Sequence, residues 1–426
     1  MIVWILLFES SRQPKGIRID GLLMINLSFA VTYGATGLMG VDGLSSRLFM
    51  NIEALNVLVG SLCLFSYLIV LVGYKMGAML GSKITISSPR IHDKAVERSC
   101  ILAFGVGLLS IFAYSSSYGG IVRSIEFAAA IRSGNMNSIE GGNYLFMKNL
   151  LPLLIFLPML SFSKICKQPS TGQIALFLGC TSVALVGLFM MAGRGRIAVF
   201  LIVLTIIYSR SDRGKMTVTP LSLVVIAVVL FLLDFYLTYG KELFRYFYSS
   251  QGYSNGGLLE KSYSPLGTVL SYYNHRVSSI FYALTDSSYS PTFFYDAFLL
   301  PLYVMPDSII GFRPPDSISY INTFLHTGVW DSTIPPGLVA YGVYSLGVIG
   351  VLLSSLVYGF VPGVLDKKLR KEAGSDKRDM YRLPMLIIWI VYFLQGDPRV
   401  FAVNMFPCIF LFFLIYSFGL LRRVRF

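Results

Sequence analysis

Apolar segments long enough to cross a bilayer recur through almost the whole chain, and this recurrence is the strongest constraint on its fold. A spanning helix needs about 20 mainly apolar residues. Ten segments approach or reach that length, at 21–40, 54–74, 100–118, 146–163, 174–192, 196–208, 218–240, 337–362, 383–396 and 400–421. Only 13% of the 426 residues are charged, against about 25% in soluble domains. The sequence therefore predicts an all-α polytopic membrane protein with 10 transmembrane helices, or 11 if residues 1–8 form one.

The distribution of lysine and arginine predicts how these helices are oriented. Cytoplasmic loops of membrane proteins carry an excess of both residues. Six alternate connections hold 23 of the 35 basic residues: 9–20, 75–99, 164–173, 209–217, 363–382 and 422–426. We therefore expect these connections and the C-terminus to be cytoplasmic. Because the basic excess is explained by orientation, it does not call for a nucleic-acid partner.

The longest polar interruption, residues 241–335, belongs to the opposite, outward set of connections. It separates N-terminal transmembrane helices (1–240) from C-terminal ones (336–426). Within it, 293–305 is apolar but contains a charge and a proline, which favours short helices lying on or dipping into the outer leaflet. We expect the loop to fold as a small extracytoplasmic helical cap and to carry function, as large loops on compact scaffolds often do.

Two short outward turns carry arginines, Gly193-Arg194-Gly195-Arg196 and Gly396-Asp397-Pro398-Arg399. Each adjoins a helix of about 13 or 14 apolar residues, shorter than the ~20 that a span needs, so the turns should lie below the outer membrane surface. A guanidinium group matches phosphate well. We therefore expect Arg194, Arg196 and Arg399 to bind an anionic substrate. The alternative is that they contact lipid headgroups or pair with acids such as Asp397.

Asp234 lies in the outer third of the apolar segment 218–240. A carboxylate within a membrane helix is a functional candidate, although Lys241 at the end of the same segment could neutralise it. Proton acceptors are also expected in the loop, which contains His275 and His326, while the third histidine, His92, lies in a cytoplasmic connection. Histidine can take a proton from a hydroxyl group during group transfer.

Several classes of site lack their sequence signatures in this chain. There is no His-Glu-x-x-His or Asp-x-Asp pattern, no phosphate-binding P-loop, no dinucleotide fingerprint and no Gly-x-Ser-x-Gly elbow. The five cysteines have neither disulfide-framework nor zinc-site spacing. We expect no metal or cofactor, so that the activated group must arrive with the substrate, as in a lipid-linked donor.

The layout and two short stretches resemble the Wzy-type oligosaccharide repeat unit polymerases, which include the O-antigen polymerases. The segment 334–350, which contains Pro335, Pro336 and Gly337 followed by a tyrosine and spaced glycines, is similar to the family's passage from its large periplasmic loop into the next helix. The stretch 191–196 is similar to its turn of small residues and arginine. The position where the family usually has an acid before the tyrosine is Ala340 here.

The resemblance implies a metal-independent GT-C-type glycosyltransferase of lipopolysaccharide biosynthesis, in the bacterial inner membrane with the loop in the periplasm. Its donor and acceptor would be undecaprenyl-pyrophosphate-linked oligosaccharides, and a chain-length regulator in the membrane would be a partner. Under this hypothesis Arg194 and Arg196 bind the donor pyrophosphate, with Arg276, Arg313 and Arg399 as further candidates. The base for the acceptor hydroxyl would be one of the following: His326, His275, Asp307 or Asp331.

Two other readings of the sequence stay open. An O-antigen ligase would use the same donor but would transfer the chain to the lipid A core. A lipid-linked oligosaccharide flippase or other transporter would favour two similar halves, broken helices near the midplane and short loops. The long loop 241–335 has no counterpart in the first half of the chain, which favours an enzyme. A membrane O-acetyltransferase is disfavoured because no paired His and Asn or Asp marks a helix.

Overall fold

The computed structural model describes most of the chain and confirms the predicted fold class. The described residues are 2–12, 20–35, 52–83, 93–128, 131, 144–166, 170–191, 194–209, 265–285, 290–305, 307–312, 317–328, 334–371 and 385–423. They contain no strand. Six helical segments in them are long and apolar enough to cross a membrane: Ala54–Lys83, Ala95–Ser116, Leu145–Ile165, Thr171–Met190, Leu338–Lys367 and Pro398–Phe418. The chain is an all-α polytopic membrane protein.

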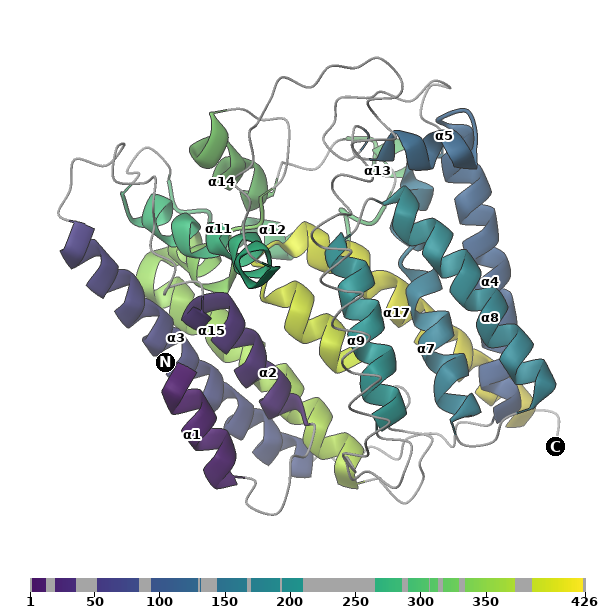
Figure 1. Ribbon diagram of the computed structural model, residues 1–426, viewed down its shortest axis with the longest axis horizontal. Helices are drawn as coiled ribbons and strands as arrows, with labels where there is room; N and C mark the ends of the chain where they lie inside the picture. Colours follow the sequence, from purple (N-terminus) through teal and green to yellow (C-terminus); the bar gives the residue numbers. More distant parts are fainter. Residues whose placement is uncertain are drawn as a thin grey trace. The chain divides into compact units, whose positions relative to one another are not determined.

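The helices in chain order are α1 (Ile2–Arg12), α2 (Gly21–Phe29), π-helical η1 (Ala30–Ala35), α3 (Ile52–Lys83), α4 (Asp93–Ser116), α5 (Ile121–Glu126), 3₁₀-helical η3 (Leu145–Leu150), α7 (Leu153–Ile165), α8 (Thr171–Met190), α9 (Arg194–Ser209), α11 (Pro265–Thr285), α12 (Tyr295–Phe298), α13 (Asp307–Ile310), α14 (Ile318–Thr327), α15 (Leu338–Lys371), π-helical η4 (Trp389–Phe393) and α17 (Pro398–Arg423) (Figure 1). The predicted helix 218–240, with Asp234, and the nearby Lys241 lie outside the described residues.

The described contacts divide the chain into two compact units. Unit 1 comprises Met1–Thr85 and Leu266–Ala402, and unit 2 comprises Ile86–Pro265 and Val403–Phe426. The described cap helices, α11 to α14, therefore pack with the first and last thirds of the chain rather than as a body of their own. Each unit is built around one apolar helix contact that glycines make possible.

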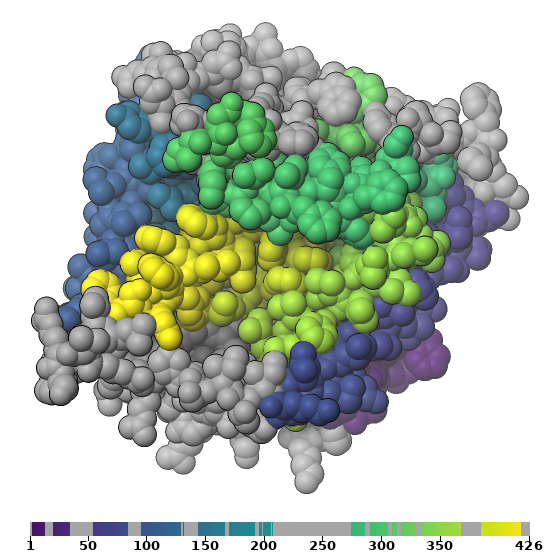
Figure 2. All heavy atoms as spheres, turned by 180° about the vertical axis from the view of Figure 1, so that it is seen from behind, coloured from purple at the N-terminus to yellow at the C-terminus, as the bar shows by residue number. Residues whose placement is uncertain are grey.

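Unit 1 is organised around α3 and α15, which run parallel and side by side (Figures 1 and 2). Glycines at four-residue spacing on α3 lie against successive turns of α15: a Cβ at Gly73 would meet the Leu356 carbonyl oxygen at 2.4 Å, and one at Gly81 would meet that of Val364 at 2.8 Å. Such small-residue spacing lets helix backbones approach closely in lipid, where dispersion rather than the hydrophobic effect drives association. Buried hydroxyls of Ser66 and Ser355 add a hydrogen bond of 2.7 Å across this contact.

The helix α15 is interrupted, whereas the sequence predicts one continuous span over 337–362. Leu346 and Gly347 have non-helical backbone angles, and Gly347 has a φ of 62°, which favours glycine. The chain turns so sharply there that a Cβ on Gly350 would lie 2.0 Å from the carbonyl oxygen of Gly342. Residues 338–345 thus form a short helix set against the cap, and the long helix that packs on α3 begins after the break.

Unit 2 is organised around α7, which has the largest buried share of the candidate spans among the described residues. Leu154 on α7 fits between two glycines, since a Cβ at Gly107 of α4 would lie 2.1 Å from its side chain and one at Gly187 of α8 would lie 3.3 Å from it. Leu154 itself is fully buried. A leucine that fills a gap left by two glycines gives close packing without polar groups.

Candidate functional site

The cap helix α14 is attached at its first turn to two buried carboxylates. The Ile318 amide donates to Asp296 Oδ2 (3.3 Å), and Ser319 Oγ donates to Asp397 Oδ2 (2.5 Å). Asp296 and Asp397 are 0% and 2% exposed. Buried carboxylates need such partners because burial of an unpaired charge is unfavourable. The position of α14 is therefore fixed to the segment around α12 and to the turn before α17.

The turn before α17 is a rigid part of this site. The Gly337 and Leu338 amides donate to the carbonyl oxygens of Gln395 (2.7 Å) and Leu394 (3.1 Å), and Gly396 has a φ of 64°. Asp397 caps the helix, because its Oδ1 accepts from the Val400 amide (3.1 Å), and side-chain capping satisfies the free amides of a helix start.

Arg399 is exposed at the start of α17 and is held by an aromatic residue of α14. Its Nη1 donates to the Tyr320 hydroxyl (3.0 Å), and its guanidinium carbon lies 5.8 Å from the centre of the Tyr320 ring. The alternative that Asp397 neutralises Arg399 by a direct ion pair is not what the described contacts show, since that carboxylate binds Ser319 and the Val400 amide. An exposed guanidinium beside an aromatic ring can bind a phosphate and a sugar face together.

The segment that carries the family resemblance lies at the junction between cap and membrane helix. The Tyr341 hydroxyl donates to Asp296 Oδ1 (2.9 Å), and the Tyr344 hydroxyl donates to Asn322 Oδ1 (3.1 Å). Asn322 in turn donates to the carbonyl oxygen of Ile334 (2.8 Å). The two tyrosines of the short helix 338–345 thus bind the α12 segment and α14 to the head of α15.

His326, a predicted base, joins α14 to α11. Its Nε2 lies 3.0 Å from Ser279 Oγ, and its ring meets the Tyr282 ring edge-on with centroids 4.5 Å apart. Burial lowers the pKa of His326 to about 4. The imidazole is therefore neutral at pH 7, and a base with so low a pKa accepts a proton only weakly. The geometry gives His326 a positioning contact, while its role as base stays a prediction.

The other predicted residues of α11 are less accessible than an open phosphate site would require. Arg276 is only 5% exposed, and its Nη1 donates to Thr32 Oγ1 of η1 (3.2 Å). The neighbouring His275 is partly buried, and its carbonyl oxygen accepts from Ser279 Oγ (2.7 Å). Arg276 therefore joins α11 to η1 in this structure.

The remaining predicted residues fall outside this cluster. Arg313 and Asp331 are outside the described residues, as are the side chains of Arg194 and Asp307. Arg196 lies at the start of α9 in unit 2, half-buried, with Nη1 against the Met191 sulfur. The predicted roles of these residues stay predictions.

The residues that the sequence did not single out as site residues are Asp296, Asp397 and Tyr341. Asp296 had a signal, because it is the one charge in the apolar stretch 293–305. Asp397 was considered only as a neutralising partner of Arg399, although an acid before a proline is a helix-start pattern. Tyr341 is the tyrosine of the segment that resembles the family, but its partner Asp296 could not be foreseen because it is 45 residues away in the sequence.

Asp296 and His326 should give opposite slopes of stability against pH. Burial raises the pKa of Asp296 to about 6. The contribution of Asp296 to the free energy of unfolding therefore falls as pH rises from 3.8 to about 6. Burial lowers the pKa of His326 to about 4, so its contribution falls as pH drops from 6.5 to about 4. The two effects oppose each other between pH 4 and 6. We expect a shallow pH dependence of unfolding in the wild-type protein over this window.

Single variants should separate the two slopes, measured as thermal unfolding of the protein in nanodiscs. His326→Gln should become less stable from pH 4 to pH 6, because the Asp296 contribution is left. Relative to the wild type, Asp296→Asn should gain stability from pH 4 to pH 6, because the Asp296 contribution, which falls over this window, has been removed. If both variants kept the wild-type profile, neither group would titrate in the folded protein as described.

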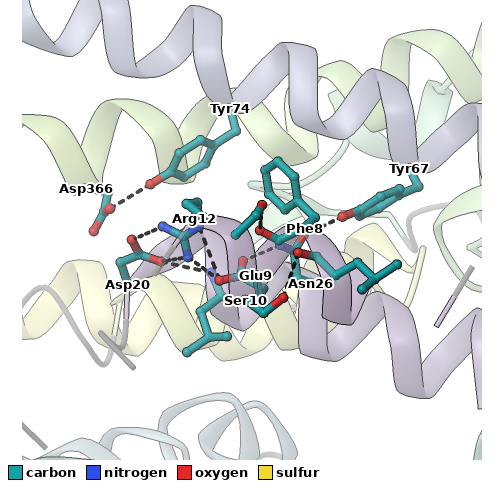
Figure 3. A network of polar contacts seen from close by, with 12 residues as sticks. Phe8, Glu9, Ser10, Arg12, Asp20, Asn26, Tyr67, Tyr74 and Asp366 are labelled. Carbon is teal, nitrogen blue, oxygen red and sulfur yellow. Dashed lines mark hydrogen bonds and ion pairs between the residues drawn. The ribbon is translucent and has the colours of Figure 1, made fainter. Parts of the chain in front are cut away.

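A second polar network lies among α1, α2 and α3 (Figure 3). Beside it, Tyr74 of α3 donates to Asp366 of α15. Arg12 binds the carboxylates of Glu9 and Asp20, each at 2.6 Å. Asn26 donates to Glu9 Oε1 (2.5 Å) and accepts from the Tyr67 hydroxyl (3.0 Å). Asp20 also caps α2 through the Leu23 amide (2.9 Å). This network fixes α1 to the body of unit 1.

Metal-type clusters of three or more His, Cys, Asp or Glu side chains do not occur among the described residues. Comparison of the chain with protein-family models, with curated proteins and with solved structures gave no match. The chain is thus a multi-pass helical membrane protein. Two buried carboxylates hold its cap helix α14 in place, beside an exposed arginine.

Proposed function

We propose that this protein is an O-antigen polymerase that joins undecaprenyl-pyrophosphate-linked oligosaccharide repeat units at the outer face of the bacterial inner membrane. The observation that carries the proposal is the exposed Arg399 guanidinium held against Tyr320, beside the stretch that resembles the family. A cation and an aromatic ring fixed together suit a ligand that combines phosphate with sugar. Tyr320 lies on α14 and Arg399 at the start of α17, so the pair joins the cap to a membrane helix.

In the proposed reaction the growing chain leaves its lipid carrier and is transferred to the non-reducing end of a new repeat unit. A hydroxyl of the acceptor attacks the anomeric carbon of the donor chain, its proton passes to a base, and the bond to the pyrophosphate breaks. Arg399 would stabilise the charge that develops on the leaving pyrophosphate, and Arg194 and Arg196 remain the sequence's own candidates for the same role. The base would be one of the four candidates from the sequence: His326, His275, Asp307 or Asp331.

Lipopolysaccharide from a strain lacking the gene tests this proposal against its rivals. A missing polymerase should leave a single repeat unit on the lipid A core, visible as one band above the core on a gel. A missing ligase or a missing flippase should leave the core without any repeat unit. A core free of repeat units in the deletion strain would therefore rule out the polymerase.

Arg399→Ala should reduce chain growth by about 100-fold, the effect of removing one charge-stabilising donor in other enzymes. The readout is the distribution of chain lengths on the gel at equal amounts of membrane-inserted protein. Tyr320→Phe is the matched control, because it removes the hydrogen bond to Arg399 but keeps the ring and the charge. It should keep most of the chain growth. Full-length chains with Arg399→Ala would contradict the phosphate role.

The interruption of α15 is one observation that supports the flippase alternative, since broken helices are frequent in transporters. In transporters such breaks lie near the membrane midplane. Here the break at 346–347 directly follows residues that contact the cap, because Thr292 and Phe293 donate to the carbonyl oxygens of Tyr344 and Ser345 (both 3.1 Å). The interruption therefore serves the attachment of the cap, and this favours the enzyme.

A further inference from the structure

The described part of the cap presents a row of exposed apolar side chains along residues 293–312. Their exposed fractions are 64% for Phe293, 81% for Phe298, 48% for Met305, 73% for Ile309 and 53% for Phe312. We call these five residues the apolar cap edge. Single exposed apolar residues are ordinary on protein surfaces, whereas a concentration of large ones marks a protein or membrane contact.

The charge pattern of this segment distinguishes between those two contacts. Only Asp296 and Asp307 are charged between residues 291 and 312, and Asp296 is fully buried. Protein interfaces usually surround their apolar centre with a polar, solvated rim. A segment this poor in charge is better suited to the uncharged acyl region of a bilayer.

The position of the edge supports the same partner. The backbone of Thr292 and Phe293 pairs with Tyr344 and Ser345, at the end of the short helix that opens α15. Just beyond the break, Val348 and Ile349 of this membrane-spanning helix are 58% and 65% exposed. The cap atoms, green in Figure 2, lie along yellow-green α15. The apolar cap edge therefore begins beside an exposed apolar part of α15.

We propose that the apolar cap edge inserts into the lipid leaflet beside α15, and that its partner is the acyl chains of the bilayer. Asp296 is part of the same segment and binds the first turn of α14. Insertion of the edge therefore sets the depth of α14 relative to the membrane surface. The Tyr320–Arg399 pair, which depends on α14, is held at that depth as well.

Spin-label accessibility in nanodiscs of phosphatidylethanolamine and phosphatidylglycerol tests this proposal on the full-length protein. Labels are placed by Phe298→Cys and Ile309→Cys, with Thr327→Cys at the exposed end of α14 as the control within the cap. Cys166→Ser is included throughout because the other four native cysteines are buried. Labels at 298 and 309 should collide severalfold more with oxygen, which concentrates in lipid, than with a water-soluble nickel chelate. The label at 327 should show the reverse preference.

Two outcomes would overturn the proposal. Equal access of the nickel chelate to 298, 309 and 327 would mean that the edge faces water. Low access of both reagents at 298 and 309 would mean that protein covers the edge, as in contact with a second copy or a partner subunit. Met305→Cys replaces either position if one variant fails to fold, as judged by its helical circular dichroism.

Discussion

Replacement of Gly77 by alanine is expected to destabilise the protein by about 1–3 kcal/mol, the range for overpacking a close contact. A Cβ at this position would lie 2.0 Å from the carbonyl oxygen of Phe360 and 3.0 Å from the Val364 amide nitrogen. Both atoms belong to the backbone of α15, so neither can rotate away as a side chain would. Helix α3 must instead move outward, and the Ser66–Ser355 hydrogen bond would lengthen with it.

The matched control for this substitution lies on the same helix. A Cβ at Gly60 would meet nothing within 4 Å, and alanine is favoured over glycine inside a helix by about 0.5–1 kcal/mol. Gly60→Ala should therefore keep or raise stability. Both variants are compared by thermal unfolding in the same detergent, followed by circular dichroism. A Gly77→Ala protein as stable as Gly60→Ala would show that α3 and α15 are not in backbone contact.

Arg12→Leu is expected to lower the free energy of unfolding by about 2–4 kcal/mol, because it leaves two carboxylates buried without their cation. The side chains of Glu9 and Asp20 are only 11% and 2% exposed, and that of Arg12 is 24% exposed. In Figure 3 the guanidinium lies between the two acids. Loss of the cation should also weaken the attachment of α1 to α2, because Arg12 on α1 holds the Asp20 that begins α2 and only the Asn26–Glu9 hydrogen bond of this network would then join the two helices.

Two further variants separate the ion pair from general effects of substitution. Arg12→Leu combined with Asp20→Asn should recover part of the loss, because asparagine keeps an acceptor for the Leu23 amide and removes one buried charge. Lys164→Leu removes an exposed ion pair to Glu97, at 3.2 Å, and should cost less than about 1 kcal/mol. The measurement is again thermal unfolding. A double variant no more stable than Arg12→Leu would argue against the charge explanation.

The fold class and most of the helices can be predicted from the sequence, because length and apolarity are local properties of a segment in lipid. The helices predicted at 54–74 and 174–192 appear as α3 and α8, the first of them longer than expected. Asp397 and Pro398 likewise begin α17 as a helix-start pattern predicts. Short helices in the loop were also expected from the interrupted apolar stretch 293–305, where α12 lies, whereas α11 and α14 were not foreseen as separate helices.

The tertiary structure alone decided which helices meet and which charges are buried. Gly77 on α3 and Gly363 on α15 are nearly 300 residues apart. Within each helix glycines recur every four residues, but this spacing becomes informative only once α3 and α15 are known to be partners. Asp296 and Asp397 likewise meet at α14 from two distant segments. Burial and pairing depend on the whole chain, whereas a sequence pattern reports only its own neighbourhood. For this reason nothing in the sequence indicated that Arg276 is buried and hydrogen-bonded to Thr32 of η1.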